Sequence, residues 1–253
     1  MKLCVTSTSY TEFHKDHTEL HGDSPSPHFT SFNKTTSRII LPNIPIGIFL
    51  SCQTAIMDKA ERTKQFILEK TAPIFNTKGY SGTSLSDLTE ATGLTKGSIY
   101  GNFANKDDVA LSAFDYNLSL LSKTRSALVA TGSNSIEKLL NMAKFYRAEF
   151  KSSMIPGGCP ILNTAIEADD THPQLREKVS KAIKAWKKSI EAIVLQGIEK
   201  HEIKSTIKAA EFATEFIAII EGGIMLYKVT GNRSLLDTCI DRVEKIITRE
   251  LKS

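Results

Sequence analysis

The spacing of apolar residues divides the chain into two unequal parts near residue 57. Beyond that point apolar positions recur every three or four residues, which is the period of an amphipathic helix. Within 58–79, for example, Ile67, Leu68, Ile74 and Phe75 fall on one side of such a helix. The last part of the chain shows no convincing strand alternation, so the pattern predicts an all-α fold.

Residues 1–56 lack this period and are rich in Ser, Thr, Pro and His. Few apolar residues recur at a fixed spacing here, so we expect a poorly ordered N-terminal tail, or an extension upstream of a real start at Met57. His14, His17 and His21 would share one face of a helix and could bind a metal there. Nothing near them predicts a helix, so no metal site is expected.

The segment 57–104 begins with a helix that starts at Asp58 and stops at Gly79, a residue that favours a left-handed cap. Pro73 should kink the last turn of this helix, because it lacks an N–H group. Ser84 followed by Asp87 has the spacing of a capping box and predicts a second helix.

This second helix is short, because Gly93 ends it. Thr95 can cap a third helix, in which Ile99 and Phe103 lie four residues apart and face the core. Two short helices joined by a Gly-containing turn form a helix-turn-helix, whose second helix fits the major groove of DNA.

The segment Phe75–Val109, FNTKGYSGTSLSDLTEATGLTKGSIYGNFANKDDV, resembles the DNA-binding domain of the tetracycline-repressor (TetR) family of bacterial transcription regulators. The matching features are KGY after the first helix, TS before the second, GLTKGSIYxxF in the third and NKDD at the start of the fourth. Asn102 is a departure, since the family often has a histidine there. The resemblance implies a ligand-responsive repressor that binds a palindromic operator in double-stranded DNA as a homodimer.

The candidate DNA contacts share a polar or small side chain on the outer side of this unit. Hydroxyl, ammonium and helix N-terminal groups suit phosphate, and a lysine also suits the guanine edge. The candidates are Thr83, Thr95, Tyr100 and Lys106 for phosphates, Lys96 and Ser98 for base edges, Gly97 for close backbone approach, and Asn102 for either. The alternative is an ordinary solvated face.

Residues 105–253 predict a larger helical domain for effector binding and dimerisation. Breaks in the periodic pattern place its helices at about 105–130, 136–151, 160–168, 173–200, 207–229 and 234–251. Two apolar stripes mark the last two helices, and the resemblance implies that these helices pair with their copies in a dimer. The stripe residues are Phe212, Phe216, Gly223, Leu236, Ile240, Val243 and Ile247, and their alternative role is the core of one protomer.

The segment Gly157–Glu167 resembles a GC-x3-N-x-A-x-E signature found in one branch of the family's ligand-binding domains. In the family, the effector pocket lies between the DNA-binding part and the dimer interface. The pocket candidates are therefore Phe114, Phe145, Cys159, Asn163 and Trp186, each with plain core packing as its alternative.

Cys159 sits at a predicted helix start, where N–H dipoles would lower the pKa of a thiol and raise its reactivity. This leaves open an alternative function, a small-molecule or thiol-based redox sensor that no longer reads DNA. The simpler interpretation, which we prefer, is that Cys159 is a small buried apolar residue.

Composition narrows the picture only slightly. The chain has 253 residues, 41% of them hydrophobic, and a net charge of +4, which permits a nucleic-acid partner without requiring one. The four cysteines form no CxxC pair, and no apolar run is long enough to cross a bilayer. No Ser/His/Asp set or phosphate-binding loop is found, so we expect neither an enzyme activity nor a cofactor. We also expect the protein to be cytoplasmic and to have no membrane partner.

Overall fold

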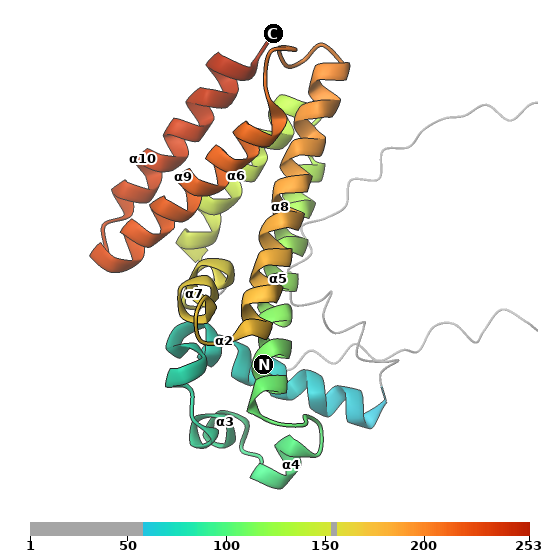
Figure 1. Cartoon of the computed structure of the whole chain (residues 1–253), viewed down its shortest axis with the longest axis vertical. Helices are drawn as coiled ribbons and strands as arrows, with labels where there is room; N and C mark the ends of the chain where they lie inside the picture. The colour runs from blue at the N-terminus through green and yellow to red at the C-terminus, as the bar shows by residue number, and fades with distance from the viewer. Residues whose placement is uncertain (1–57, 153–155) are drawn as a thin grey trace, which may run out of the picture. The chain divides into compact units, whose positions relative to one another are not determined.

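The computed structural model describes residues 58–152 and 156–253, which fold almost entirely as helices (Figure 1). An isolated β-bridge joins Ile203 to Lys252. The predicted all-α fold is confirmed. The predictions for residues 1–56, including the three histidines, lie outside the described residues.

The first three helices are α2 (Lys59–Gly82), α3 (Leu85–Thr92) and α4 (Lys96–Tyr100). Each begins after a side chain that accepts a hydrogen bond from a backbone N–H group three residues further on. The caps are Asp58 (2.8 Å), Ser84 (3.1 Å) and Thr95 (3.2 Å). The predicted capping box is present, since the Asp87 carboxylate also accepts from the backbone N–H of Ser84.

Backbone geometry sets the ends of these helices. Gly79 interrupts α2 with φ 75° and ψ 177°, whereas the chain keeps helical geometry at Pro73. Gly93 ends α3 in the left-handed conformation, as expected. The helix α4 is shorter than expected, because Asn102 donates a side-chain hydrogen bond to the Ser98 carbonyl at 2.9 Å and replaces a backbone donor there.

The remaining helices match the predicted order. They are α5 (Lys106–Ala130), α6 (Ser135–Ser152), α7 (Pro160–Ala168), α8 (Pro173–Glu199), α9 (Ala209–Thr230) and α10 (Arg233–Lys245), followed by a π-helical turn, η1 (Ile246–Leu251). Figure 1 shows α3 and α4 at one end of α5, with α9 and α10 beside the other helices toward its opposite end.

Two hydrophobic clusters hold these helices together. The smaller cluster joins α2, α3, α4 and the first turn of α5, and its buried members are Ile67, Leu88, Ile99, Phe103 and Val109. The larger cluster fills the space between α5 and the C-terminal helices. The helix α5 therefore contributes to both cores, and Val109 belongs to the first one although it follows the predicted domain boundary at 104.

The predicted dimer-interface residues take the alternative role given for them, the core of one protomer. Buried within a single protomer are Phe212, Phe216, Gly223, Leu236, Ile240, Val243 and Ile247. A Cβ atom at Gly223 would lie 2.8 Å from Cys239 Cβ, so this glycine allows α9 and α10 to pack closely in the same chain. The two stripes form the core, and any partner must contact other faces of these helices.

Candidate functional site

The helix α4 has one apolar side and one polar side. Ile99 is fully buried against α2 and α3, while Lys96 and Gly97 are exposed. Ser98 and Tyr100 are half-buried beside them. Among the described residues, only Thr95 Oγ1 lies within 4.0 Å of a Cβ placed at Gly97. No described part of the chain therefore covers Gly97 on the outer side of α4.

The predicted phosphate contact at Thr83 is wrong. This side chain is only 1% exposed, and its hydroxyl donates to the carbonyl oxygen of Gly79 at 2.6 Å. Thr83 therefore closes the break at the end of α2. Thr95 is exposed, so its hydroxyl proton is available while its oxygen caps α4.

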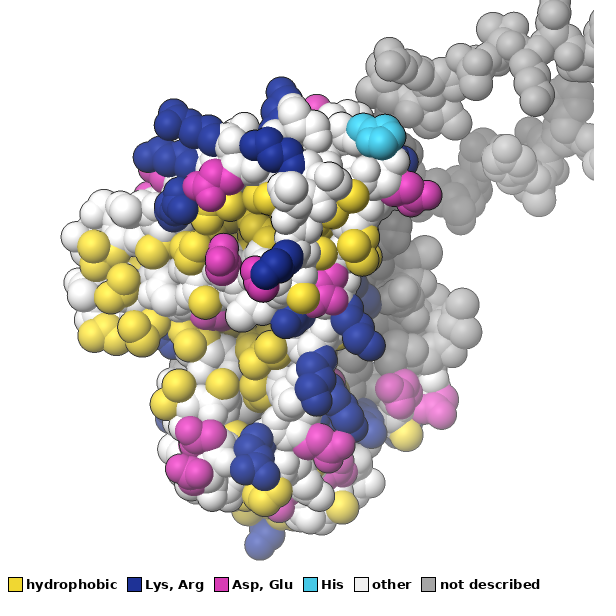
Figure 2. Space-filling model, turned by 45° about the horizontal axis from the view of Figure 1, so that its top comes forward, with side chains coloured by type: hydrophobic (Ala, Val, Ile, Leu, Met, Phe, Trp, Pro, Cys, Tyr) yellow, Lys and Arg dark blue, Asp and Glu magenta, His cyan; other side chains and the backbone are white. Residues whose placement is uncertain are grey.

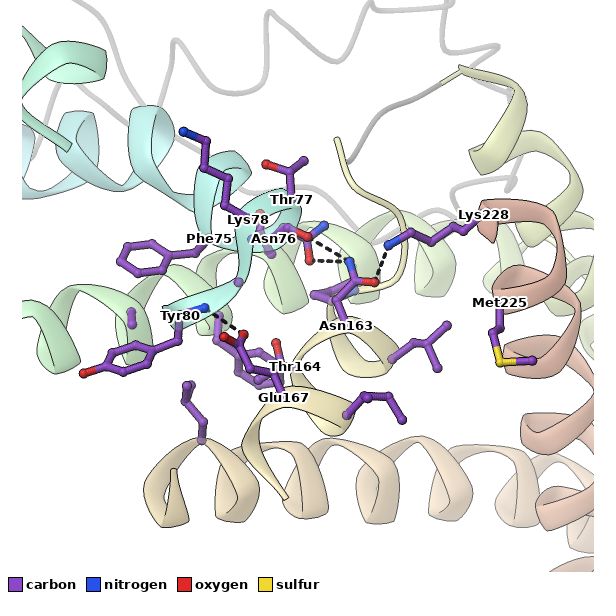
Figure 3. Close-up of a pocket in the computed structure, with 18 of the residues that line it drawn as sticks. Phe75, Asn76, Thr77, Lys78, Tyr80, Asn163, Thr164, Glu167, Met225 and Lys228 are labelled. Carbon is purple, nitrogen blue, oxygen red and sulfur yellow. Dashed lines mark hydrogen bonds between the residues drawn. The ribbon is translucent and has the colours of Figure 1, made fainter. Parts of the chain in front are cut away.

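The end of α2 is fastened to α7 and to the loop before it (Figure 3). Asn76 donates through Nδ2 to the carbonyl oxygens of Pro156 (2.7 Å) and Gly158 (2.9 Å). Asn163 of α7 donates to the backbone oxygen of Asn76 at 2.9 Å. Lys228 of α9 donates to Asn163 Oδ1 at 2.5 Å. These bonds link three helices that lie far apart in the sequence.

Glu167, at the other end of α7, holds the break in α2. Its two carboxylate oxygens accept from the backbone N–H groups of Tyr80 and Ser81, each at 2.7 Å. A Cβ atom at Gly79 would collide with this carboxylate, and the φ of +75° is also strained for other residues. The break and Glu167 therefore form one unit, which we call the α2–α7 clamp.

Tyr80 extends the contact to α5 and α8. Its hydroxyl donates to Asp107, and this bond, together with burial, raises the pKa of Tyr80 to about 12. The ring meets His172 edge-on with the centroids 4.7 Å apart. The Lys106 ammonium lies 4.3 Å from the centroid of the Tyr80 ring, so a phosphate would have to compete with this cation–π contact.

Two cavities lie beside α7. The junction cavity, about 370 Å³, is open to solvent on one side and bordered by α2, α5, α7, α8 and α9, and its wall includes Phe75, Phe114, Asn163 and Met225. The body cavity, about 460 Å³, lies between α5, α6, α7 and α8, and Trp186 is part of its wall.

The five predicted pocket residues do not share one pocket. Phe114 and Asn163 line the junction cavity and Trp186 lines the body cavity. Phe145 and Cys159 are buried in the larger core and line neither cavity. The five candidates are thus divided between two cavities and the core, and core packing is the alternative given for each of them.

Sequence reasoning missed Asn76, Glu167 and Arg125. Glu167 belongs to the recognised signature but was given no role, and Asn76 carries no local signal. Arg125 lines the body cavity although it is charged. Arg125 falls four residues after Leu121 and three before Leu128, on the side of the helix that carries apolar residues. A cation at such a position is unusual, and this could have identified Arg125 from the sequence.

The structure places Cys159 in the core as a buried residue and gives no support to the reactive-thiol alternative. The thiol is 1% exposed and donates to Glu221 Oε1 at 3.0 Å. Burial raises its pKa well above the usual value, and the nearby Glu221 carboxyl adds to this. A thiol that stays protonated is a poor nucleophile, so the redox-sensing alternative is not favoured.

Glu221 should make the stability of the protein depend on pH. Burial raises the pKa of Glu221 from 4.5 to about 7. Between these values the folded state holds a proton that the unfolded state has released, so the free energy of unfolding falls as pH rises, by at most about 3 kcal/mol. Glu221→Gln stays neutral and should lose this contribution. Urea unfolding at about pH 5 and about pH 8 measures the difference, with exposed Glu211→Gln on the same helix as control. Parallel pH slopes for wild type and Glu221→Gln would show that Glu221 does not titrate here.

The helix α9 exposes an apolar face on the side opposite its buried stripe. Val229 is 83% exposed, and Met225 and Leu226 are also exposed. Ala218 and Gly222 continue this face, and none of the residues that the structure describes packs within 4 Å of a Cβ placed at Gly222. Figure 2 shows hydrophobic side chains gathered on the left of the view, the side on which Figure 1 places α9 and α10. We call Ala218, Gly222, Met225, Leu226 and Val229 the outer face of α9.

The described residues hold no group of three or more His, Cys, Asp or Glu side chains that could bind a metal ion. Within the same ranges, every helix is too short or too polar to cross a membrane.

Comparison with known proteins agrees with this arrangement. Residues 67–113 match the family described as bacterial regulatory proteins of the tetR family, and residues 135–243 match its tetracyclin repressor-like C-terminal domain. The HTH-type transcriptional repressor DhaR of Mycobacterium sp. (strain GP1) is 27% identical over 175 residues, which cover 69% of this chain and 86% of that protein.

Two solved structures are closer in sequence. A TetR-family transcriptional regulator from Cytophaga hutchinsonii is 44% identical, with a TM-score of 0.73, covering 78% of this chain and 98% of the other. A TetR transcriptional regulator from Chloroflexus aurantiacus is 35% identical, with a TM-score of 0.74, covering 78% and 99%. On the helix-turn-helix, the helical body and these likenesses together, the chain belongs to the TetR family of bacterial transcription regulators.

Proposed function

We propose that the protein is a ligand-responsive transcriptional repressor that binds a palindromic DNA operator as a homodimer. The observation that carries the proposal is the two-sided α4, whose apolar side is fixed in the core while Lys96 and Gly97 face outward. A rigidly held helix with a free polar side suits the major groove. The similar protein DhaR is named as a repressor, which supports repression of transcription over activation. Such a protein acts in the cytoplasm, where bacterial DNA lies.

The roles of individual residues follow from their exposure. Lys96 and Ser98 are the proposed contacts to base edges, and Gly97, which is exposed and has no side chain, would let the backbone approach. Thr95 and Tyr100 flank them and suit phosphate oxygens. Asn102 has one amide hydrogen engaged with Ser98, which leaves its oxygen and the other hydrogen for DNA.

The outer face of α9 is the proposed dimer contact. Three exposed apolar side chains lie on it, next to two small residues that allow close approach of a second helix. Burying such a face on a two-fold copy would remove apolar area from water and place two α4 helices on one duplex.

The α2–α7 clamp is the proposed connection between effector and DNA. At its start α7 places Ile161 in the wall of the body cavity, and further along it places Asn163 and Glu167 against α2. A ligand that moves α7 would therefore move α2 and change the position of α4. The affinity for operator would fall if the ligand prefers the position that misfits the DNA.

Substitution of Lys96 tests the proposed function. An operator is first selected from genomic fragments that bind the full chain. Lys96→Ala should then weaken specific binding by about 1–3 kcal/mol, because one base or phosphate contact is lost. The measurement is a binding titration at several salt concentrations, in which wild-type affinity should fall steeply as salt rises.

Lys188→Ala is the matched control, since Lys188 is exposed on α8 and away from α4. Equal operator affinity for wild type and Lys96→Ala would remove Lys96 from the interface. Failure of the full chain to select any DNA would contradict the proposed function itself.

A further inference from the structure

A buried cation lies in the wall of the body cavity. Arg125 of α5 is 8% exposed, and its guanidinium donates to the Tyr146 hydroxyl at 3.0 Å. The guanidinium carbon lies 5.0 Å from the centre of the Trp186 ring. Among the side chains that the structure describes, no carboxylate comes within 4.0 Å of Arg125.

This arrangement leaves Arg125 short of partners. A guanidinium has five N–H donors, and a buried arginine is normally paired with a carboxylate. Here a phenol oxygen and an aromatic face take that place, and they leave donors free toward the cavity. Glu221 interacts electrostatically with Arg125 from further away. Because burial raises the pKa of Glu221 to about 7, this carboxyl group is only partly ionised near neutral pH.

The rest of the cavity wall points to the same kind of ligand. Its second charged group is another cation, Lys138, and neither aspartate nor glutamate is part of the wall. Ser122, Ser126 and Ser189 add hydroxyl groups. The remaining surface is apolar and includes Leu118, Val129, Met142, Ile161 and Ile193. A pocket of this composition suits a mainly apolar molecule with one polar group.

We infer that the body cavity binds a small organic anion, whose charged group pairs with Arg125 and whose apolar part lies between α5, α6 and α8. A carboxylate, sulfonate or phosphate offers at least two oxygens, which match two parallel N–H groups of the guanidinium. This inference rests on the proposed function, because it names the chemical class of the effector.

Trp186 gives a direct readout, since it is the chain's one tryptophan and it lines this cavity. The probes are three anions with neutral counterparts of similar shape: benzoate and benzamide, octanoate and octanamide, 8-anilinonaphthalene-1-sulfonate and N-phenyl-1-naphthylamine. Each is titrated into the full chain while Trp186 fluorescence is recorded. At least one anion should bind at least tenfold more tightly than its neutral counterpart.

Variants connect this preference to Arg125. Arg125→Met should abolish the preference for the anion, and Arg125→Lys should keep part of it. If Arg125→Met unfolds, Arg125→Gln serves instead, because its amide can still donate to Tyr146. Lys184→Met is the control, since Lys184 is exposed on the same helix as Trp186 and lines neither cavity.

Two results would overturn the inference. One is that no anion changes Trp186 fluorescence at millimolar concentration, or that each neutral probe binds as well as its anion. The other is an anion preference that persists in a folded Arg125→Met or Arg125→Gln variant. Operator binding by the wild-type chain without any probe tests the proposed function separately, so the two can fail independently.

Discussion

Gly222→Glu should convert the protein into a monomer and lower its operator affinity at least about a hundredfold, because two linked binding events become one. Gly222 lies in the middle of the outer face of α9, and a side chain there meets open space within the protomer. The substitution should therefore leave the protomer folded, and the loss of a helical glycine favours the helix by about 1 kcal/mol. A partner helix, by contrast, would meet both a charge and added bulk.

Sedimentation and operator titration measure the two effects on the same samples. Gly222→Ala is the control, because it gives a similar gain in helix propensity without a charge or a long side chain, and it should remain dimeric. A dimer of Gly222→Glu with normal operator affinity would place the interface on another surface.

Glu167→Ala should release the α2–α7 clamp. The carboxylate accepts two backbone hydrogen bonds of 2.7 Å at the break in α2, and bonds to a charged acceptor are the stronger kind. Their loss should lower local stability by about 2 kcal/mol, which corresponds to about thirtyfold faster hydrogen exchange at the Tyr80 and Ser81 amides.

Residue-resolved hydrogen exchange measures this directly. Ile166→Ala is the matched control, since Ile166 is the exposed neighbour on the same helix. Unchanged protection of both amides in Glu167→Ala would mean that α7 does not hold α2, and the proposed route from effector to DNA would lose its basis.

The sequence was most informative where the determinants are local. Ser84 and Thr95 each cap the helix that follows, as expected, because capping depends on side chains within three residues of the helix start. Ile99 and Phe103 are buried as predicted. A short helix pressed between two others has only one apolar side, so its polar side follows directly.

The sequence was least informative where two burial partners were possible. The stripe through Phe212 and Phe216 showed that one face of α9 is buried, but not whether its own chain or a copy covers it. A second apolar face, through Leu226 and Val229, is exposed in the protomer, and this is why we propose it as the contact with a copy.

Contacts that form only in the folded protein also give some residues a role that differs from the predicted one. Thr83 was a candidate phosphate contact, yet its hydroxyl donates to the carbonyl oxygen of Gly79 at the helix break. Cys159 stands at a helix start, yet burial beside Glu221 outweighs the helix dipole and raises the pKa of the thiol. Glu167 and Asn76 meet only after the chain folds, so no local spacing joins them.

The most direct test of the whole account is the affinity of the dimer for operators that differ only in half-site spacing. Two α4 helices on a two-fold axis require half-sites about one helical turn, or a multiple of it, apart. Insertion of about half a turn between the half-sites should abolish tight binding, and insertion of a full turn should restore part of it. Equal affinity at every spacing would show that the two α4 helices do not bind one duplex together, and would contradict the account.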